Sequence, residues 1–488
     1  MIRRASASVA VALWIVDAAL GPAAGQSPAA PDPASSFAER LERNPLDRQA
    51  MVGRVEALLA SDRWRTALEE ARAYSAVAPD DRHVTTALAE ALFRAGELAE
   101  SEALLVPIVE RPDAPARAQL TLGRLYDARG RSADAVDRMD RAVAAADDDP
   151  WVMYWSADAT RSRAEAIERL ERYVELAGPD DEDRIEAAEG SLRLYRALGE
   201  TPIWVDENRP ERAELPLRQL WDPTTSATIG YVIEARIGDK DKPVKLLLDT
   251  GSPGLYVIDR IADKRGFREL SLQTTFGGGG DRRHATRRGF FDSFAVGELS
   301  FRSALATAAK HEIDPLGRFH GVVGISIFNG YRVTLDLAAE RLVLAPIDEE
   351  PAAGAPYWVV GGQWLVEASI VPDGRSGLFL LDTGATRSLL SLALLDGLAA
   401  AVVRQGAEVH GFGGMIDGAR EVDGVRLDFH GLGVGPGGLR AADLSLQSKM
   451  GGVELSGFVG LDLLEGPVIT IDTERRTVRV EANDDSRR

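Results

Sequence analysis

The chain has 488 residues, a formal net charge of -19 and no cysteine. The negative charge disfavours nucleic acid as a partner, and the lack of cysteine excludes disulfides, thiolate catalysis and cysteine-ligated metal sites. At this length several domains are expected, because single cores rarely grow beyond about 300 residues.

Residues 1–25 have the pattern of a secretory signal peptide. Arg3 and Arg4 precede an apolar run over residues 5–16, and small residues follow, with Ala23 and Gly25 at the expected cleavage site. The run is too short to span a bilayer comfortably, and a retained N-terminal anchor is the alternative. We therefore expect an exported protein, periplasmic or secreted, with no stable membrane insertion after cleavage.

The next segment, residues 26–43, is rich in Pro, Ala and Ser, and we expect a disordered spacer there. Residues 44–200 have a helical pattern throughout, because apolar residues recur at three- and four-residue steps among Ala, Leu, Glu and Arg. Turn residues recur at intervals of 34 residues, at Asp62, Gly96 and Gly130. Each is followed by a small residue and then a packing residue: Ala67 and Ala71, Ser101 and Leu105, Ala135 and Met139, with a displaced fourth copy at Ala166.

A helix pair of this length resembles the tetratricopeptide repeat. The resemblance implies an α-helical solenoid in which small residues let paired helices approach closely and neighbouring pairs supply the core. It also implies a concave groove for a protein partner or peptide. The alternative is a helical spacer that only packs on the neighbouring domain.

The last half of the chain is strand-rich and contains two similar copies of one sequence pattern. Residues 232–252 align with 365–385 without a gap, at an offset of 133, and residues 321–344 align with 457–480 at an offset of 136. We therefore expect two lobes, residues 227–346 and 359–483. They would be flanked by a linker at 201–226, an inter-lobe linker at 347–358 and a tail at 484–488.

Three landmarks occur in the same order in both copies. They are Asp-Thr-Gly after an apolar run (249–251 and 382–384), Phe-Gly-Gly (276–278 and 412–414) and a hydrophobic pair before Gly324 and Gly460. Together they resemble the aspartic peptidases, whether retropepsin-like or pepsin-like. The predicted fold class is therefore multidomain α and β: a tetratricopeptide-like solenoid followed by a bilobal all-β acid-protease fold.

The resemblance implies that Asp249 and Asp382 are the catalytic residues. Two carboxyl groups that face each other share one proton, so the ionised member can activate a water while the protonated member donates to a peptide carbonyl. This chemistry requires no metal and no cofactor. The resemblance also implies that the turns support this dyad and that glycines brace it: Thr250, Gly251, Ser252, Thr383, Gly384, Ala385, Gly324 and Gly460.

Two glycine-bearing hairpins are expected to act as flaps over an extended substrate. The flap residues would be Phe276, Gly277, Gly278, His410, Phe412, Gly413 and Gly414. Two flaps favour a fused retroviral-type dimer over pepsin, because the pepsin-like enzymes carry one flap with a tyrosine and neither hairpin here has one.

The two turns differ at one position, which is Ser252 in the first copy and Ala385 in the second. A hydroxyl that donates to a carboxylate favours its ionised form. The sequence therefore predicts that Asp249 is the more readily ionised member and that Asp382 more often carries the proton.

The leading hypothesis is an exported aspartic endopeptidase that acts on a peptide or protein substrate, with a helical domain that binds substrate or a protein partner. One alternative is a non-catalytic peptide-binding or scaffolding protein on a peptidase fold, which two intact aspartates disfavour. Another is a peptidase that processes itself, with residues 207–216 as the candidate cleavage region.

Overall fold

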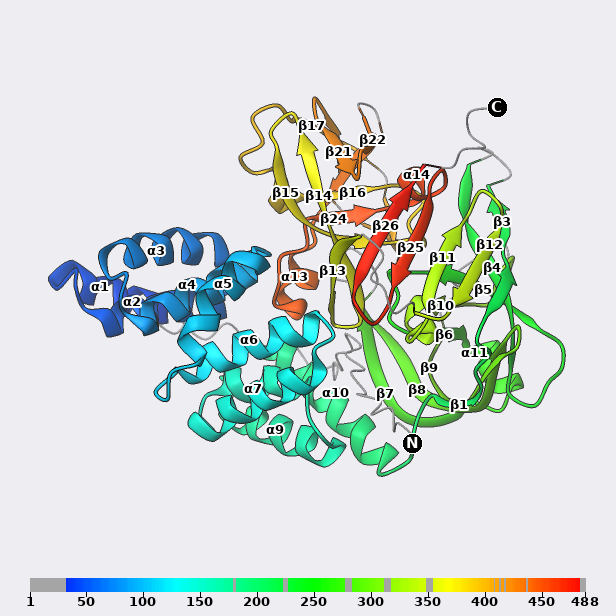
Figure 1. Cartoon of the computed structure of the whole chain (residues 1–488), viewed down its shortest axis with the longest axis horizontal. Helices are drawn as coiled ribbons and strands as arrows, with labels where there is room; N and C mark the ends of the chain where they lie inside the picture. The colour runs from blue at the N-terminus through cyan, green and yellow to red at the C-terminus, as the bar shows by residue number, and fades with distance from the viewer. Residues whose placement is uncertain are drawn as a thin grey trace, which may run out of the picture. The chain divides into compact units, whose positions relative to one another are not determined.

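The computed structural model describes residues 32–482 except 179–180, 223–226, 277–282, 311–316, 348–353, 408, 412–413, 417 and 436–437. The chain forms two compact units (Figure 1), and each is described by itself. The helical unit comprises the described residues of 32–188 together with 448–454, and the strand-rich unit comprises those of 189–447 and 455–482.

Helix pairs that recur every 34 residues build the helical unit. The first helices of the pairs are α2 (Arg48–Ala60), α4 (Arg82–Ala95), α6 (Ala116–Ala128) and α8 (Pro150–Ser156). The second helices are α3 (Trp64–Val77), α5 (Leu98–Val109), α7 (Ser132–Ala145) and α9 (Arg163–Leu176). Two further helices, α1 (Pro33–Arg43) and α10 (Glu182–Leu198), precede and follow the pairs.

The predicted repeat positions are confirmed. Asp62, Gly96 and Gly130 have positive φ angles of 59°, 87° and 77°, as turn residues between helices require. The small residues five positions later are completely buried, and the Ser101 hydroxyl donates to the backbone carbonyl of Ala89 (2.7 Å). The 34-residue period is therefore the period of the packing.

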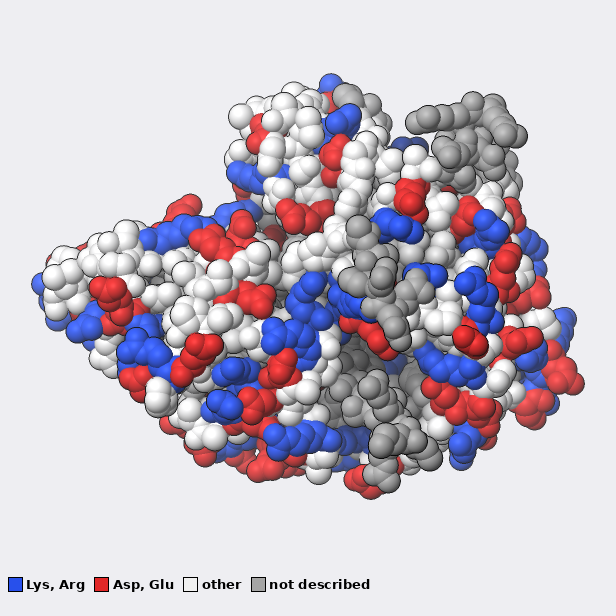
Figure 2. Space-filling model, in the orientation of Figure 1, with Lys and Arg blue, Asp and Glu red and all other residues white. Residues whose placement is uncertain are grey.

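Charges of both signs are mixed on the surface, as the face shown in Figure 2 illustrates. In the helical unit, exposed pairs such as Arg72–Glu100 (3.0 Å) and Arg131–Asp134 (2.9 Å) account for part of this mixing. Exposed ion pairs contribute only about 0–1 kcal/mol each, so they serve solubility more than stability.

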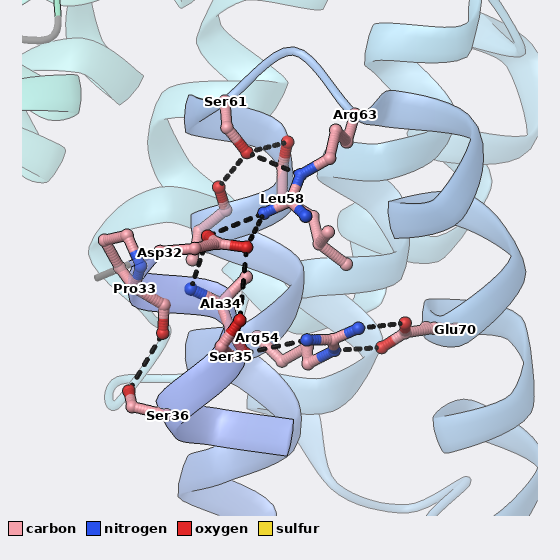
Figure 3. A network of polar contacts seen from close by, with 11 residues as sticks. Asp32, Pro33, Ala34, Ser35, Ser36, Arg54, Leu58, Ser61, Arg63 and Glu70 are labelled. Carbon is pink, nitrogen blue, oxygen red and sulfur yellow. Dashed lines mark hydrogen bonds and ion pairs between the residues drawn. The ribbon is translucent and has the colours of Figure 1, made fainter. Parts of the chain in front are cut away.

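The spacer prediction is wrong for residues 33–43, which form α1. Asp32 caps this helix by accepting a backbone N–H of the first turn (3.1 Å), and Pro33 occupies the first helical position, where proline is tolerated. Arg54 then fastens α1: it donates to a carbonyl of α1 (2.7 Å) and forms a two-pronged pair with Glu70 of α3 (2.7 and 2.8 Å), as Figure 3 shows. The Pro and Ser residues at 33, 35 and 36, which suggested a spacer, lie instead in the first turn of this helix.

The strand-rich unit contains two lobes. The sheet of the first lobe has the order β1 (Val205–Asn208), β9 (Leu299–Ala309), β6 (Leu255–Ile258), β10 (Gly321–Gly324), β5 (Val244–Asp249), β4 (Thr228–Ile237), β8 (Arg283–Val296) and β7 (Arg268–Phe276), with β3 (Arg218–Trp221) beside β4. Helix α11 (Asp259–Lys264) follows β6, and the 3-10 helix η2 (Ile325–Phe328) follows β10.

The second sheet joins the other lobe to the centre of the unit. Its order is β17 (Val402–Gln405), β20 (Arg420–Asp423), β23 (Leu439–Ala442), β16 (Leu389–Ser391), β24 (Gly457–Val459), β15 (Arg375–Leu381), β14 (Gln363–Val371), β13 (Ala355–Val360), β26 (Thr477–Glu481), β25 (Val468–Asp472), β11 (Arg332–Asp336), β12 (Arg341–Ala345) and β2 (Ala213–Pro216). Strands β21 (Arg426–Phe429) and β22 (Leu432–Val434) extend from β14, while β18 (His410–Gly411) pairs with β19 (Gly414–Met415). The helices are α12 (Leu392–Leu395), α13 (Ser445–Gly451) and α14 (Leu461–Leu464).

The two sequence copies fold alike and meet on a local twofold axis. In each, the strand that leads to the aspartate lies parallel to a later glycine-bearing strand, β5 beside β10 and β15 beside β24. Strands β11 and β25 pair antiparallel so that Thr334 lies opposite Thr470, its own counterpart at the offset of 136. The duplicated lobe predicted from the sequence is therefore confirmed.

The predicted linkers are wrong where the structure describes them. Within residues 201–226, β1 pairs with β9, β2 with β12 and β3 with β4. Leu215, Leu217 and Leu220 are buried, so this segment is packed on the lobe rather than being a free linker. The predicted inter-lobe linker likewise ends inside β13, which pairs with β14 and β26.

Within the described part of the chain, no helix is both long and apolar enough to cross a membrane. The predicted signal peptide and the tail at 484–488 lie outside the described residues.

Candidate active site

Both aspartates stand at the ends of buried strands near the local twofold axis. Asp249 is the last residue of β5, and Asp382 directly follows β15. The apolar residues before each of them point into the lobe cores. Each strand is therefore buried along its length and leads to an aspartate at the centre of the unit.

The threonines of the two turns hold each other reciprocally. Thr250 donates its hydroxyl to the carbonyl of Leu381 (2.6 Å) and accepts the N–H of Thr383 (3.0 Å). Thr383 donates to the carbonyl of Leu248 (2.8 Å) and accepts the N–H of Thr250 (3.1 Å). Both side chains are fully buried, so four hydrogen bonds fix one turn against the other without competition from water. This confirms the predicted contact across the lobes.

The glycines of the turns let each carboxyl group approach the opposite turn. A Cβ atom at Gly251 would lie 2.8 Å from the carboxyl carbon of Asp382, and one at Gly384 would lie 2.6 Å from that of Asp249. Real Cβ atoms do not come this close to other heavy atoms, so only glycine fits at either position. The two carboxyl groups are therefore held in mutual contact.

Backbone donors and the neighbouring carboxyl group set the protonation of the pair. Gly251 donates its N–H to Asp249 Oδ1 (2.8 Å), while Gly384 and Ala385 donate theirs to Asp382 Oδ1 (2.8 and 3.1 Å). Burial, the charge of Asp382 and a hydrogen bond to it raise the pKa of Asp249 well above its ordinary value. Burial also raises the pKa of Asp382, against the lowering effect of the hydrogen bond from Asp249 and of the backbone donors. The two carboxyl groups therefore titrate as one pair that retains a proton.

The expectation from Ser252, that Asp249 is the more readily ionised member, stays a prediction. In the described part of the chain, the Ser252 hydroxyl forms no hydrogen bond with Asp249. The backbone N–H of Ser252 donates to the Asp249 carboxyl group, which lowers its pKa, and also to the backbone carbonyl of Asp249 (3.2 Å). Ala385 supports Asp382 equally well through its own backbone N–H. The donors that the structure shows at both carboxyl groups are backbone groups, which residues 252 and 385 both possess.

Gly324 and Gly460 brace the two turns as predicted. Gly324 lies opposite Asp249 in the β10–β5 ladder, and a Cβ atom there would lie 2.0 Å from the carbonyl oxygen of Ser252. A Cβ atom at Gly460 would lie 2.6 Å from the carbonyl carbon of Arg387. Both glycines therefore permit a close backbone approach that any side chain would block.

The sequence analysis missed a polar support of the second brace. Asp462 Oδ1 accepts both the N–H (2.9 Å) and the hydroxyl (2.6 Å) of Ser388, and the Ser388 hydroxyl accepts the N–H of Gly460 (3.0 Å). In the first copy Ser326 takes the place of Asp462 and donates to the carbonyl of Pro253 (2.9 Å). The signal was available, because the offset of 136 aligns Asp462 with Ser326.

The two predicted flaps are hairpins. Strands β7 and β8 pair up to Phe276 opposite Arg283, and β18 and β19 pair with Gly411 opposite Gly414. The turn residues Gly277, Gly278, Phe412 and Gly413 lie outside the described residues, as do the side chains of Phe276 and His410. That the hairpins cover a substrate stays a prediction.

No cluster of three or more His, Asp or Glu residues suited to a metal ion occurs among the described residues.

Part of the first lobe matches a known protein family. Residues 233–327 match the family model described as aspartyl protease, a stretch that includes Asp249 and Gly324. Among solved structures, the chain is similar to the aspartic proteinase from Irpex lacteus, with 15% sequence identity over 56% of this chain and 98% of that chain and a TM-score of 0.37. A search among curated proteins found no match.

Proposed function

We propose that this protein is an aspartic endopeptidase in which Asp249 and Asp382 activate a water molecule to hydrolyse a peptide bond. The observation that carries the proposal is the mutual contact of the two carboxyl groups, enforced by the reciprocal threonine bonds and by glycines that admit no side chain. A merely structural turn needs neither a second acid nor such close approach of two like charges.

The proposed reaction follows from the single proton of the pair. The ionised member of the pair accepts a proton from water as the water oxygen bonds to the peptide carbonyl carbon, and the protonated member donates its proton to the carbonyl oxygen. Collapse of the resulting diol breaks the C–N bond, with one proton passing to the nitrogen and one returning to the pair. The dyad ends with the single proton it began with.

The wider proposal concerns substrate and location. A substrate in extended form would lie beneath the β7–β8 and β18–β19 hairpins, which would exclude water from the reacting bond. The 34-residue period supports a tetratricopeptide-like solenoid, and the first 25 residues support export to the periplasm or outside the cell.

The test is cleavage of a diverse peptide library by the chain without its first 25 residues, scanned from about pH 3 to about pH 8. Asp249→Asn and Asp382→Asn should each abolish cleavage, and a statine-type transition-state mimic should block it. Asp373→Asn, in an exposed turn, is the matched control and should leave cleavage unchanged. If the protein neither cleaves nor binds the mimic, the scaffolding alternative replaces the proposal.

A further inference from the structure

The helical unit contains a segment that comes from far along the chain. Residues 448–454 belong to it, although the residues on either side of them belong to the strand-rich unit. The segment comprises the end of α13 and the three residues after it. Its contacts with the helices are therefore internal to the helical unit.

The helices hold the backbone of this segment at three points. Arg124 of α6 donates to the carbonyl of Gly451 (3.0 Å), and Arg184 of α10 donates to the carbonyl of Lys449 (3.1 Å). In the other direction, the N–H of Glu454 donates to the carbonyl of Arg94 in α4 (2.7 Å). Backbone recognition by charged donors of this kind is typical of a bound peptide.

Charged side chains add a second layer of contacts. Arg94 pairs with Glu454 (3.2 Å) and with Asp62 (2.5 Å), and the side chains of Arg94 and Glu454 are only 5% and 8% exposed. Lys449 pairs with Asp183 (2.7 Å). Removal of one partner from a buried pair leaves an uncompensated charge, so the segment is costly to detach.

The shape of the segment also matches the helices. The Arg124 guanidinium lies 4.3 Å from the ring centroid of Phe93 and 3.7 Å from that of Trp155. Gly452 has a φ of 61°, and a Cβ atom there would lie 2.6 Å from both Trp155 and Arg124. A glycine is therefore required at this position, both by the backbone conformation and by the space.

The contacting residues lie on α4, α6 and α8, the first helices of three successive pairs, and on α10, which follows the pairs. One face of the repeat array is thus occupied by a segment of the same chain. We infer that residues 448–454 are a built-in ligand of the helical unit and that their binding anchors the brace of Asp382.

The chain between the two anchor points is short. Glu454 is bound to Arg94, and two residues later the N–H of Ser456 donates to the carbonyl of Leu378 in β15 (2.7 Å). Val459 then accepts the N–H of Asp382 (3.0 Å). Release of Glu454 frees the strand that fixes the second catalytic turn, so the helical unit positions the active site in addition to any role in recruiting partners.

Hydrogen exchange of the full chain, measured by mass spectrometry, tests this inference without relying on catalysis. Arg124→Ala alters the helical face and Gly452→Ala alters the segment. Each should speed amide exchange at least about tenfold in 448–454 and in 457–462, the change expected for loss of one charge-assisted hydrogen bond. Arg72→Ala removes an exposed pair of the same unit and should leave both stretches unchanged.

The anchoring inference rests on the proposed function only in its activity readout. If the protein is the proposed peptidase, both variants should lower kcat with little change in KM, because the dyad and not substrate binding is disturbed. Faster exchange in 448–454 with unchanged exchange in 457–462 would overturn the anchoring role. Unchanged exchange in 448–454 would overturn the claim that the helices bind this segment. A wild-type protein that never cleaves would refute the proposed function while leaving the exchange result decisive.

Discussion

Single residues decide the chemistry of the carboxyl pair. Asp249 and Asp382 each lie beside the opposite turn only because positions 251 and 384 are glycine. Once in contact, the two groups cannot both ionise without repulsion, and burial acts in the same direction by raising the pKa of each. The shared proton of the pair is therefore a property of the site.

The pKa shift of Asp249 has a consequence for stability. A carboxyl group whose pKa is raised on folding contributes stability that is fully present below the unfolded pKa and is lost as the pH rises through the folded pKa. Asp249→Asn removes the ionisation, so the variant should be more stable than the wild type at pH 8, on the order of 1 kcal/mol, and no more stable at pH 3. Urea unfolding at both pH values measures this. A stability difference independent of pH would contradict it.

A hydroxyl at position 385 should act on Asp382. Ala385→Ser adds a donor beside the carboxyl oxygen that already accepts the backbone N–H of residue 385, which favours the ionised form. The acidic limb of the pH–rate profile should therefore move to lower pH, by up to about one unit. Ser252→Ala is the matched control: its hydroxyl forms no hydrogen bond with Asp249 in the described structure, so the profile should stay in place. An acidic limb that is unmoved in Ala385→Ser would contradict the argument.

At the scale of elements, each catalytic turn depends on a glycine-bearing strand laid against it, but the two braces differ. The second uses three hydrogen bonds that link Ser388, Asp462 and the backbone of Gly460, whereas the first uses one hydrogen bond from Ser326. Equivalent backbone geometry is thus maintained by unequal polar support.

That inequality can be measured. Asp462→Ala removes two hydrogen bonds and leaves the buried Ser388 without its acceptor, so it should cost about 2–3 kcal/mol of stability and lower kcat. Ser326→Ala, at the equivalent position, removes one hydrogen bond and should cost about 1 kcal/mol. Denaturant unfolding and peptide cleavage compare the two. Equal losses of stability would show that Asp462 adds nothing beyond what Ser326 provides.

The elements that could be predicted are those whose sequence pattern is local or recurs along the chain. The 34-residue helical period and the duplicated lobe could be read from spacing alone, and the dyad followed from the two matched turns. Strands β1, β2 and β3 were missed because each is only four residues long and gains its stability from distant partners. The contact of residues 448–454 with α4 could not be predicted, because nothing in its pattern points to a partner 360 residues away.

At the scale of the whole molecule, the two units are interleaved along the chain. Residues 448–454 belong to the helical unit, although the chain on both sides of them belongs to the strand-rich unit. A chain with two independent domains would instead have a single boundary between them.

Interleaving of this kind predicts cooperative unfolding. Neither unit can unfold without withdrawing or releasing the segment that both share, so the wild-type chain should show one calorimetric transition, with equal calorimetric and van't Hoff enthalpies. Gly452→Ala detaches the segment through steric conflict with Trp155 and Arg124 and should divide the heat absorption into two transitions. Arg72→Ala, the surface control, should keep one. Two transitions in the wild type would mean that the segment binds too weakly to link the units, because a tightly held segment would force them to unfold together.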